Sequence, residues 1–325
     1  MTAGRTSISA VFGDPAAQAA VRQVILGTGS IRPTRLPKLR DQVLQHLDNP
    51  QDPIRADTGA ENQHGLDVTA SHLRTAELYW VAEDMVALAA HSGGQLTEAR
   101  WATADRPSPC GLIVWQGGVS GASISPPGGG GSVVMPIEVC SWGPAEGGLQ
   151  VVVWLSRRAL AAGVATSGQD VQQDAVPPLI PIASWVLPVT ADPVPMQDLP
   201  QGTPLPMVGA LAAGWLLMQQ PTLADRRVER PEKAVRRAYA RQGRPAPEVT
   251  IVDLRRRYVP QDRDPDAGAE EGRRYRHRWV VSGHWRSQPF GRERALRRQQ
   301  WIPSYVKGPD GAPLLATEKV NVWRR

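Results

Sequence analysis

The run Leu-Gln-Val-Val-Val-Trp-Leu at residues 149–155 indicates the fold class most directly. Its β-branched and aromatic side chains favour a strand, and two similar runs precede it at 111–115 and 133–142. Glycine-containing connections separate the three runs, which is typical of an antiparallel meander. The glycines at 128–131 are not followed by the lysine of a phosphate-binding loop, so we interpret them as a hairpin tip.

Helical patterns flank these strands. Apolar residues recur at helical spacing in 37–47 and 71–91, and residues 208–219 are apolar on almost every side, as in a buried helix. A further helix is predicted at 231–242, with proline in its first turn and glycine just past its end.

Four strand patterns separated by turn residues follow in the C-terminal part: 249–259, 273–286, 300–306 and 314–323. We therefore predict an α+β fold. N-terminal helices accompany the antiparallel meander, and a C-terminal helix pair packs on a four-stranded antiparallel sheet.

Charge is divided unevenly along the 325 residues. Residues 1–225 contain 12 Lys and Arg against 19 Asp and Glu, net −7, whereas residues 226–325 contain 25 against 12, net +13. Such segregation is typical of a basic binding module joined to an acidic scaffold; a GC-rich genome would also raise the arginine content. We predict a poorly ordered N-terminus at 1–30, an acidic α+β domain at 31–200 and a basic nucleic-acid-binding domain at 201–325.

The two cysteines, Cys110 and Cys140, lie in apolar strand-like runs and are predicted to be buried, reduced thiols. Reduced thiols indicate a cytoplasmic protein. The first 16 residues lack the apolar segment of a signal peptide, and the longest apolar run, 207–218, is too short to span a bilayer. We therefore expect no membrane partner.

The sequence Arg-Arg-Tyr-Arg-His-Arg-Trp-Val-Val-Ser-Gly-His-Trp-Arg at residues 273–286 separates into two faces when it is read with a period of two. One face is basic and polar, with Val280 as its apolar exception: Arg274, Arg276, Arg278, Ser282, His284 and Arg286. The other face is mostly aromatic and apolar: Tyr275, His277, Trp279, Val281, Gly283 and Trp285. A nucleic acid, either RNA or DNA, would relieve the repulsion among the arginines.

Further residues are predicted to extend this nucleic-acid-binding surface. They are the arginines of a basic loop and two aromatic residues that follow it: Arg292, Arg297, Arg298, Trp301 and Tyr305. The arginines would contact phosphates, and the two aromatic side chains would stack on bases. The alternative for each tryptophan is core packing.

His284 is the candidate catalytic residue. Positive neighbours favour a neutral imidazole, which can act as a general base toward a ribose 2′-hydroxyl. Arg286 and Lys307 would stabilise the negative charge that develops on the reacting phosphate. The alternative is that His284 is a hydrogen-bonded strand residue without a catalytic role.

No metal site is predicted. Asp262, Asp264 and Asp266 alternate in an acidic loop, but the remaining ligands of a calcium-binding loop are missing. The sequence contains no dinucleotide fingerprint, nucleophile elbow or His-Glu-x-x-His pair, so we expect no cofactor.

One motif carries a resemblance to other proteins. Gly283-His284-Trp285-Arg286, followed by Gly291 and by Trp-Ile-Pro-x-Tyr-Val-Lys-Gly-Pro at 301–309, resembles an uncharacterised protein family of actinobacteria and their phages and plasmids. The resemblance is most specific over 275–312 and weaker at 215–225 and 105–115. It implies a mobile-element or phage-related setting and assigns no catalytic residue.

The leading hypothesis is an intracellular nucleic-acid-binding protein whose basic antiparallel sheet contacts the phosphate backbone. His284 extends this hypothesis to a metal-independent ribonuclease. The alternative is a non-catalytic interaction protein, in which the basic sheet docks an acidic protein partner such as the acidic part of another copy of the chain.

Overall fold

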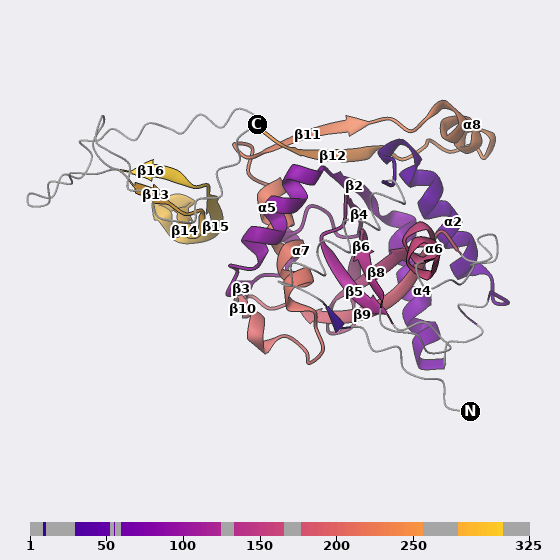
Figure 1. Cartoon of the computed structure of the whole chain (residues 1–325), viewed down its shortest axis with the longest axis horizontal. Coiled ribbons are helices and arrows are strands. Elements are labelled where there is room, and N and C mark those ends of the chain that lie inside the picture. The colour runs from indigo at the N-terminus through magenta and orange to yellow at the C-terminus, as the bar shows by residue number, and fades with distance from the viewer. Residues whose placement is uncertain are drawn as a thin grey trace, which may run out of the picture. The chain divides into compact units, whose positions relative to one another are not determined.

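The computed structural model describes residues 9–10, 30–52, 55, 60–124, 133–165, 177–255 and 279–307. The chain forms two compact units, Met1–Leu254 and Arg255–Arg325. Helices and a large mixed sheet make up the first unit (Figure 1), and the described part of the second consists of short antiparallel strand pairs. The predicted α+β fold class is confirmed.

A seven-stranded sheet forms the centre of the first unit. In spatial order its strands are β11 (Ala224–Glu229), β12 (Val249–Leu254), β2 (Glu77–Val81), β4 (Gly111–Trp115), β7 (Val139–Ala145), β8 (Gly148–Ser156) and β9 (Leu179–Pro188). The inner strands β12, β2 and β4 are parallel, and all other neighbours in the sheet are antiparallel. The pairs β4–β7 and β7–β8 confirm the predicted meander, and β9, which was not predicted as part of it, extends it by one strand.

Helices cover both faces of this sheet (Figure 1). One face carries α2 (Leu36–Asp48) and α4 (Ala60–Thr75), and the other carries α5 (Glu83–Gly93) and α7 (Leu205–Met218). Strand β2 contributes to both layers, because Leu78 joins the core with α2 and α4, while Tyr79 stacks on Trp142, which contacts Trp215 of α7. Burial on both faces explains why the inner strands read as continuous apolar runs.

The helix predicted at 71–91 is wrong. The structure has the end of α4, then strand β2, then the start of α5 in this range. The apolar residues 78–81 of β2 belong to an inner parallel strand that is covered on both faces, so apolar side chains do not alternate with polar ones there. A short apolar run of this kind cannot be distinguished from a buried helix by periodicity.

The chain divides after Leu254 and not at the predicted boundary between residues 200 and 201. Strand β12 pairs in parallel with β2, so a segment that was assigned to the basic domain lies inside the sheet of the first unit. Within the described ranges, the predicted four-stranded C-terminal sheet is therefore not seen as one sheet. Its first strand belongs to the large sheet, and 314–323 lies outside the described residues, as does most of the N-terminal segment at 1–30.

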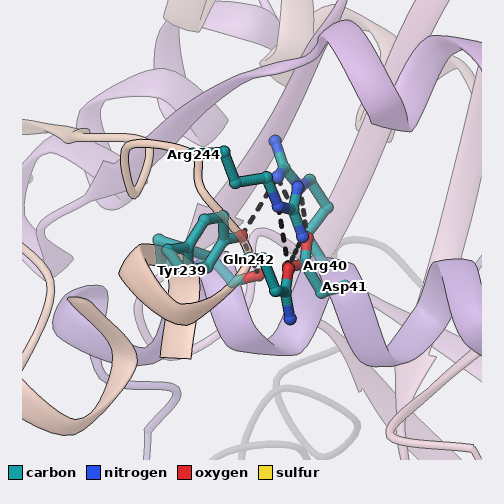
Figure 2. Close-up of polar contacts among 6 residues, drawn as sticks. Arg40, Asp41, Tyr239, Gln242 and Arg244 are labelled. Carbon is teal, nitrogen blue, oxygen red and sulfur yellow. Dashed lines mark hydrogen bonds and ion pairs between the residues drawn. The ribbon is translucent and has the colours of Figure 1, made fainter. Parts of the chain in front are cut away.

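Helix α8 (Lys233–Arg241) connects β11 to β12 and is joined to α2 by a polar network (Figure 2). Arg40, which is buried, donates from Nη2 to the Tyr239 hydroxyl at 3.1 Å, and that hydroxyl donates to the carbonyl oxygen of Pro37 at 3.3 Å. Burial raises the pKa of Tyr239 to about 12. Arg244 pairs with Asp41 at 2.9 Å and lies over the Tyr239 ring, so this network supports the fold.

The remaining described elements are short. They are the sheet of β1 (Ser9–Ala10), β5 (Ser120–Ile124) and β6 (Val133–Ile137), the pair of β3 (Glu98–Ala99) and β10 (Val194–Pro195), and helix α6 (Arg157–Ala165). Short 3-10 helices lie at η1 (Pro33–Arg35), η2 (Thr103–Asp105) and η4 (Met196–Asp198). Both cysteines are free thiols; Cys140 is buried, which raises its pKa to about 12, whereas Cys110 is only half-buried.

Candidate nucleic-acid interface

Two strand pairs form the described part of the second unit. Strand β13 (Trp279–Val281) pairs with β16 (Tyr305–Lys307), and β14 (His284–Phe290) pairs with β15 (Leu296–Ile302), both antiparallel. The strand predicted at 273–286 is therefore interrupted at 282–283. The interruption separates His284 from β13 and starts a new pairing, in which β14 and β15 form a hairpin of seven residue pairs.

The register of the hairpin defines two faces, because residues that lie directly opposite each other in an antiparallel pair share a face. The first, which we call the arginine face, consists of His284, Arg286, Gln288, Phe290, Leu296, Arg298, Gln300 and Ile302. The second, the tryptophan face, consists of Trp285, Ser287, Pro289, Arg297, Gln299 and Trp301. Arg297 and Arg298, which were predicted to act together, therefore lie on opposite faces.

The tryptophan face is packed at the Trp285–Trp301 end, whereas Ser287 and Arg297 on the same face are exposed. Trp285 lies opposite Trp301, with ring centroids 5.3 Å apart and planes at 67°, an edge-to-face contact. Only 3 % of Trp301 is exposed, which corrects the expectation that its indole is free to stack on bases. Tyr305 is half-buried on β16, opposite Val281. Core packing, the alternative for the tryptophans, accounts for Trp301.

The arginine face is open. Arg286 and Arg298 are exposed, and neither forms an ion pair with a carboxylate of the described residues. The only acidic residue of 279–307 is Glu293, against six lysines and arginines. It lies in the turn, 3.9 Å from Arg292, and both side chains of that pair are exposed. Among the described residues, Glu293 is therefore the only carboxylate that pairs with an arginine of the hairpin.

His284 is exposed at the start of β14, on the same face as Arg286. Its Nδ1 lies 3.0 Å from the backbone carbonyl oxygen of Ser282. Because a carbonyl only accepts, Nδ1 carries the hydrogen, and the neutral ring then has an unprotonated Nε2. This tautomer can accept a proton. Lys307, the third member of the predicted catalytic group, lies opposite Trp279 in the other strand pair.

The turn of the hairpin contains residues that the sequence pattern did not identify. Gly291, Glu293 and Arg294 have positive φ values of 79°, 55° and 57°, and Arg292–Arg294 form the 3-10 helix η5. Phe290 and Leu296, which flank this turn and lie opposite each other, are 39 % and 55 % exposed. Their exposure depends on the position of the turn, which the period-two pattern of 273–286 does not contain.

Several predicted site residues are not placed. Arg274, Arg276 and Arg278 lie outside the described residues, as do the acidic loop and the glycine-rich segment at 128–131. Ser282 is exposed and contributes its carbonyl to His284. Among the residues that are described, no three histidine, cysteine or carboxylate side chains are grouped as metal ligands would be. No helix within the described ranges has the length and apolar character needed to cross a bilayer.

Comparisons with known proteins assign neither a family nor a function to the chain. No family model and no curated protein matches the chain. Among solved structures, the crystal structure of AcrVA2 is similar over 89 % of this chain and 97 % of that chain, with 12 % sequence identity and a TM-score of 0.37. A similarity of this size carries no argument about function.

Proposed function

We propose that the chain binds nucleic acid through the arginine face of the β14–β15 hairpin. The observation that supports this most is the register, which places Arg286 and Arg298 on one exposed face with no described carboxylate partner. The two are diagonal neighbours across the strands, so their Cα atoms are about 7–8 Å apart. A strand of duplex DNA has a phosphate about every 3.4 Å along the axis, so both guanidinium groups can contact one backbone.

The test uses two arginines that are adjacent in sequence. Arg298→Ala and Arg297→Ala remove the same charge, but only Arg298 lies on the arginine face. Binding of a fluorescein-labelled 20-nucleotide RNA or DNA to the full chain is measured by anisotropy at several salt concentrations. We expect Arg298→Ala to weaken binding and to reduce the slope of log K against log salt by about 0.7–0.9, the value for one phosphate contact. Arg297→Ala should leave the slope unchanged.

Equal effects of the two substitutions would mean that net charge and not the arginine face determines binding. No binding of either nucleic acid at low salt would overturn the proposal. In that case an acidic protein partner, such as the acidic part of a second copy of the chain, becomes the better explanation of the exposed arginines. Sedimentation of the chain alone at low and at high salt would then detect self-association.

A second candidate function, metal-independent cleavage of RNA, is favoured by one specific observation. The hydrogen bond from His284 to the Ser282 carbonyl leaves Nε2 as a proton acceptor on an exposed face beside Arg286. A general base in this position would take the proton of a 2′-hydroxyl, and the guanidinium group would hold the neighbouring phosphate. The mobile-element or phage-related setting implied by the resemblance stays a prediction.

A further inference from the structure

Two exposed apolar side chains lie at the turn end of the arginine face. Phe290 and Leu296 form the last residue pair of the hairpin, and 39 % and 55 % of their surfaces are exposed. Most exposed apolar residues in proteins are isolated and need no explanation. This pair differs because it is contiguous and lies on the same face as Arg286 and Arg298, for which the described residues provide no carboxylate partner.

The turn holds the pair in place. The amide of Arg294 donates to the carbonyl of Gly291 at 3.2 Å, and the amide of Ala295 donates to the carbonyl of Arg292 at 3.2 Å. Gly291 has a φ of 79° and lies beneath Leu296, since a Cβ at this position would be 3.2 Å from Leu296 Cδ1. The leucine therefore packs on the turn backbone, and its outer surface faces away from it.

Three arginines belong to the same end of the hairpin as the apolar pair. Arg292, Arg294 and Arg298 are all exposed, and the guanidinium carbon of Arg298 lies 5.4 Å from the centre of the Phe290 ring. A matching ligand therefore combines a planar apolar group with nearby negative charge. A nucleotide has both, because its base stacks on aromatic side chains while its phosphate pairs with arginine.

An anionic lipid surface also combines apolar and negative groups, but it fits less well. Membrane binding increases with the apolar area that enters the bilayer, and stable anchoring needs more than one such signal. Here the apolar area comes from two side chains, one of which is partly covered by Arg298. The apolar surface of a single base is closer in size to this area than the surface that a bilayer would contact.

We infer that the Phe290–Leu296 pair packs against unstacked bases, so that the chain prefers single strands, loops and bulges to continuous duplex. The inference rests on the proposed nucleic-acid binding and adds the class of substrate. In a continuous duplex both faces of each base are already stacked, and a side chain gains access only by separating a base step. An unpaired base offers its face without that cost.

The test compares two labelled 24-base-pair DNA duplexes that differ only in a central three-nucleotide bulge. We expect the wild-type chain to bind the bulged duplex at least about tenfold more tightly, and Phe290→Ala to remove this preference, since a base–aromatic stack has an effect of that order. Affinity for the continuous duplex should change less than about twofold, because the phosphate contacts remain. Phe290→Tyr should retain the preference. The matched control is Val228→Ala, which changes an exposed valine of β11 in the first unit.

A second measurement does not depend on any variant. With 2-aminopurine in the bulge, saturating wild-type protein should change the fluorescence of the probe, as expected when the base stacks on a ring. An unchanged signal, equal affinity for the two duplexes, or a preference that survives Phe290→Ala would overturn the inference while leaving nucleic-acid binding intact. Absence of binding to both duplexes and to RNA duplexes of the same sequences would instead contradict the proposed function. Binding to phosphatidylglycerol vesicles that requires Phe290, without a preference for the bulge, would identify lipid as the ligand and overturn the inference.

Discussion

Gly283 lies directly against the indole of Trp301, because a Cβ at position 283 would be 2.6 Å from Trp301 Cζ2. This contact explains why glycine precedes His284 in the Gly-His-Trp-Arg motif. It also connects the interrupted end of the predicted strand to the packed side of the hairpin. An isolated two-stranded hairpin is marginally stable, so the edge-to-face pair of Trp285 and Trp301 is an important part of its support.

Gly283→Ala should therefore destabilise the hairpin. The added methyl group must displace the Trp301 ring or the backbone, and overpacking of this kind costs about 1–3 kcal/mol. Hydrogen exchange of the amides in β14 and β15 should become faster, while exchange in the seven-stranded sheet stays as in the wild type. Ser282→Ala, a change at the exposed neighbouring residue, is the control. Equal exchange rates in both variants would show that the Trp301 ring moves aside without loss of hairpin stability.

Because the chain divides after Leu254, truncation near this residue should leave the first unit folded. A chain that ends at residue 255 keeps all seven strands of the large sheet and should unfold cooperatively, with nearly the same Tm as the first unit has in the full chain. A fragment that starts at residue 202 keeps β11 and β12 but lacks β2, so the inner edge of β12 is left without its partner. Circular dichroism should show that this fragment lacks a cooperative transition. A cooperative melt of the 202–325 fragment would contradict the assignment of β12.

His72 should give the first unit a pH-dependent stability. It is buried, and this burial lowers the pKa of the imidazole from its usual value of 6.5, although its hydrogen bond to the Pro144 carbonyl opposes the shift. The unfolded chain therefore takes up a proton near pH 6.5 that the folded chain does not. This contribution to stability is complete above pH 6.5 and is lost as the pH falls toward the lowered pKa.

Urea unfolding of the wild type and of His72→Gln at pH 5.5 and at pH 7.5 measures this effect. The difference in unfolding free energy between the two proteins should be larger at pH 7.5. His91, which is exposed on α5, provides the control substitution His91→Gln. A difference that is independent of pH for His72→Gln would mean that the imidazole titrates alike in the folded and the unfolded chain.

The sequence pattern predicted those helices and strands that can be recognised from the composition of their own residues. The runs of β-branched and aromatic residues in β4 and β8 and the apolar α7 were identified because composition alone separates them from loops. The sequence pattern did not predict strand pairs whose members lie far apart in the sequence. Nothing near residues 249–254 shows that they lie beside 78–81, because parallel pairing is determined by the whole sheet.

For the candidate site, the sequence pattern suggested the type of surface but not the face on which each residue lies. The period-two interpretation of 273–286 assumed one continuous strand, whereas the described part, 279–286, is interrupted at 282–283. Within β14 the interpretation agrees with the register, since His284 and Arg286 share a face. The alternation of side chains along β15 places Arg297 and Arg298 on opposite faces. The turn at 291–295 sets the register, which decides that Arg298 shares a face with Arg286 and that the buried Trp301 lies opposite Trp285. Residue type can suggest an anion-binding surface, but the face that each arginine occupies depends on a turn whose geometry includes two left-handed non-glycine residues.

The last prediction concerns His284 as a general base. If Nε2 removes the proton of a 2′-hydroxyl, the resulting oxygen attacks the adjacent phosphorus and the bond to the 5′-oxygen breaks. The 5′-oxygen takes a proton from water to become a hydroxyl, and the other product ends in a 2′,3′-cyclic phosphate. RNA should then be cut in the presence of EDTA, whereas DNA should be bound without cleavage. His284→Ala should lower the cleavage rate by about 10²–10⁴-fold with little change in affinity, the range expected for loss of one acid–base group. Arg297→Ala, which lies on the tryptophan face, should cleave like the wild type. Cleavage that is undiminished in His284→Ala, or intact RNA after incubation with the wild type, would make His284 a structural residue of a protein that binds without catalysis.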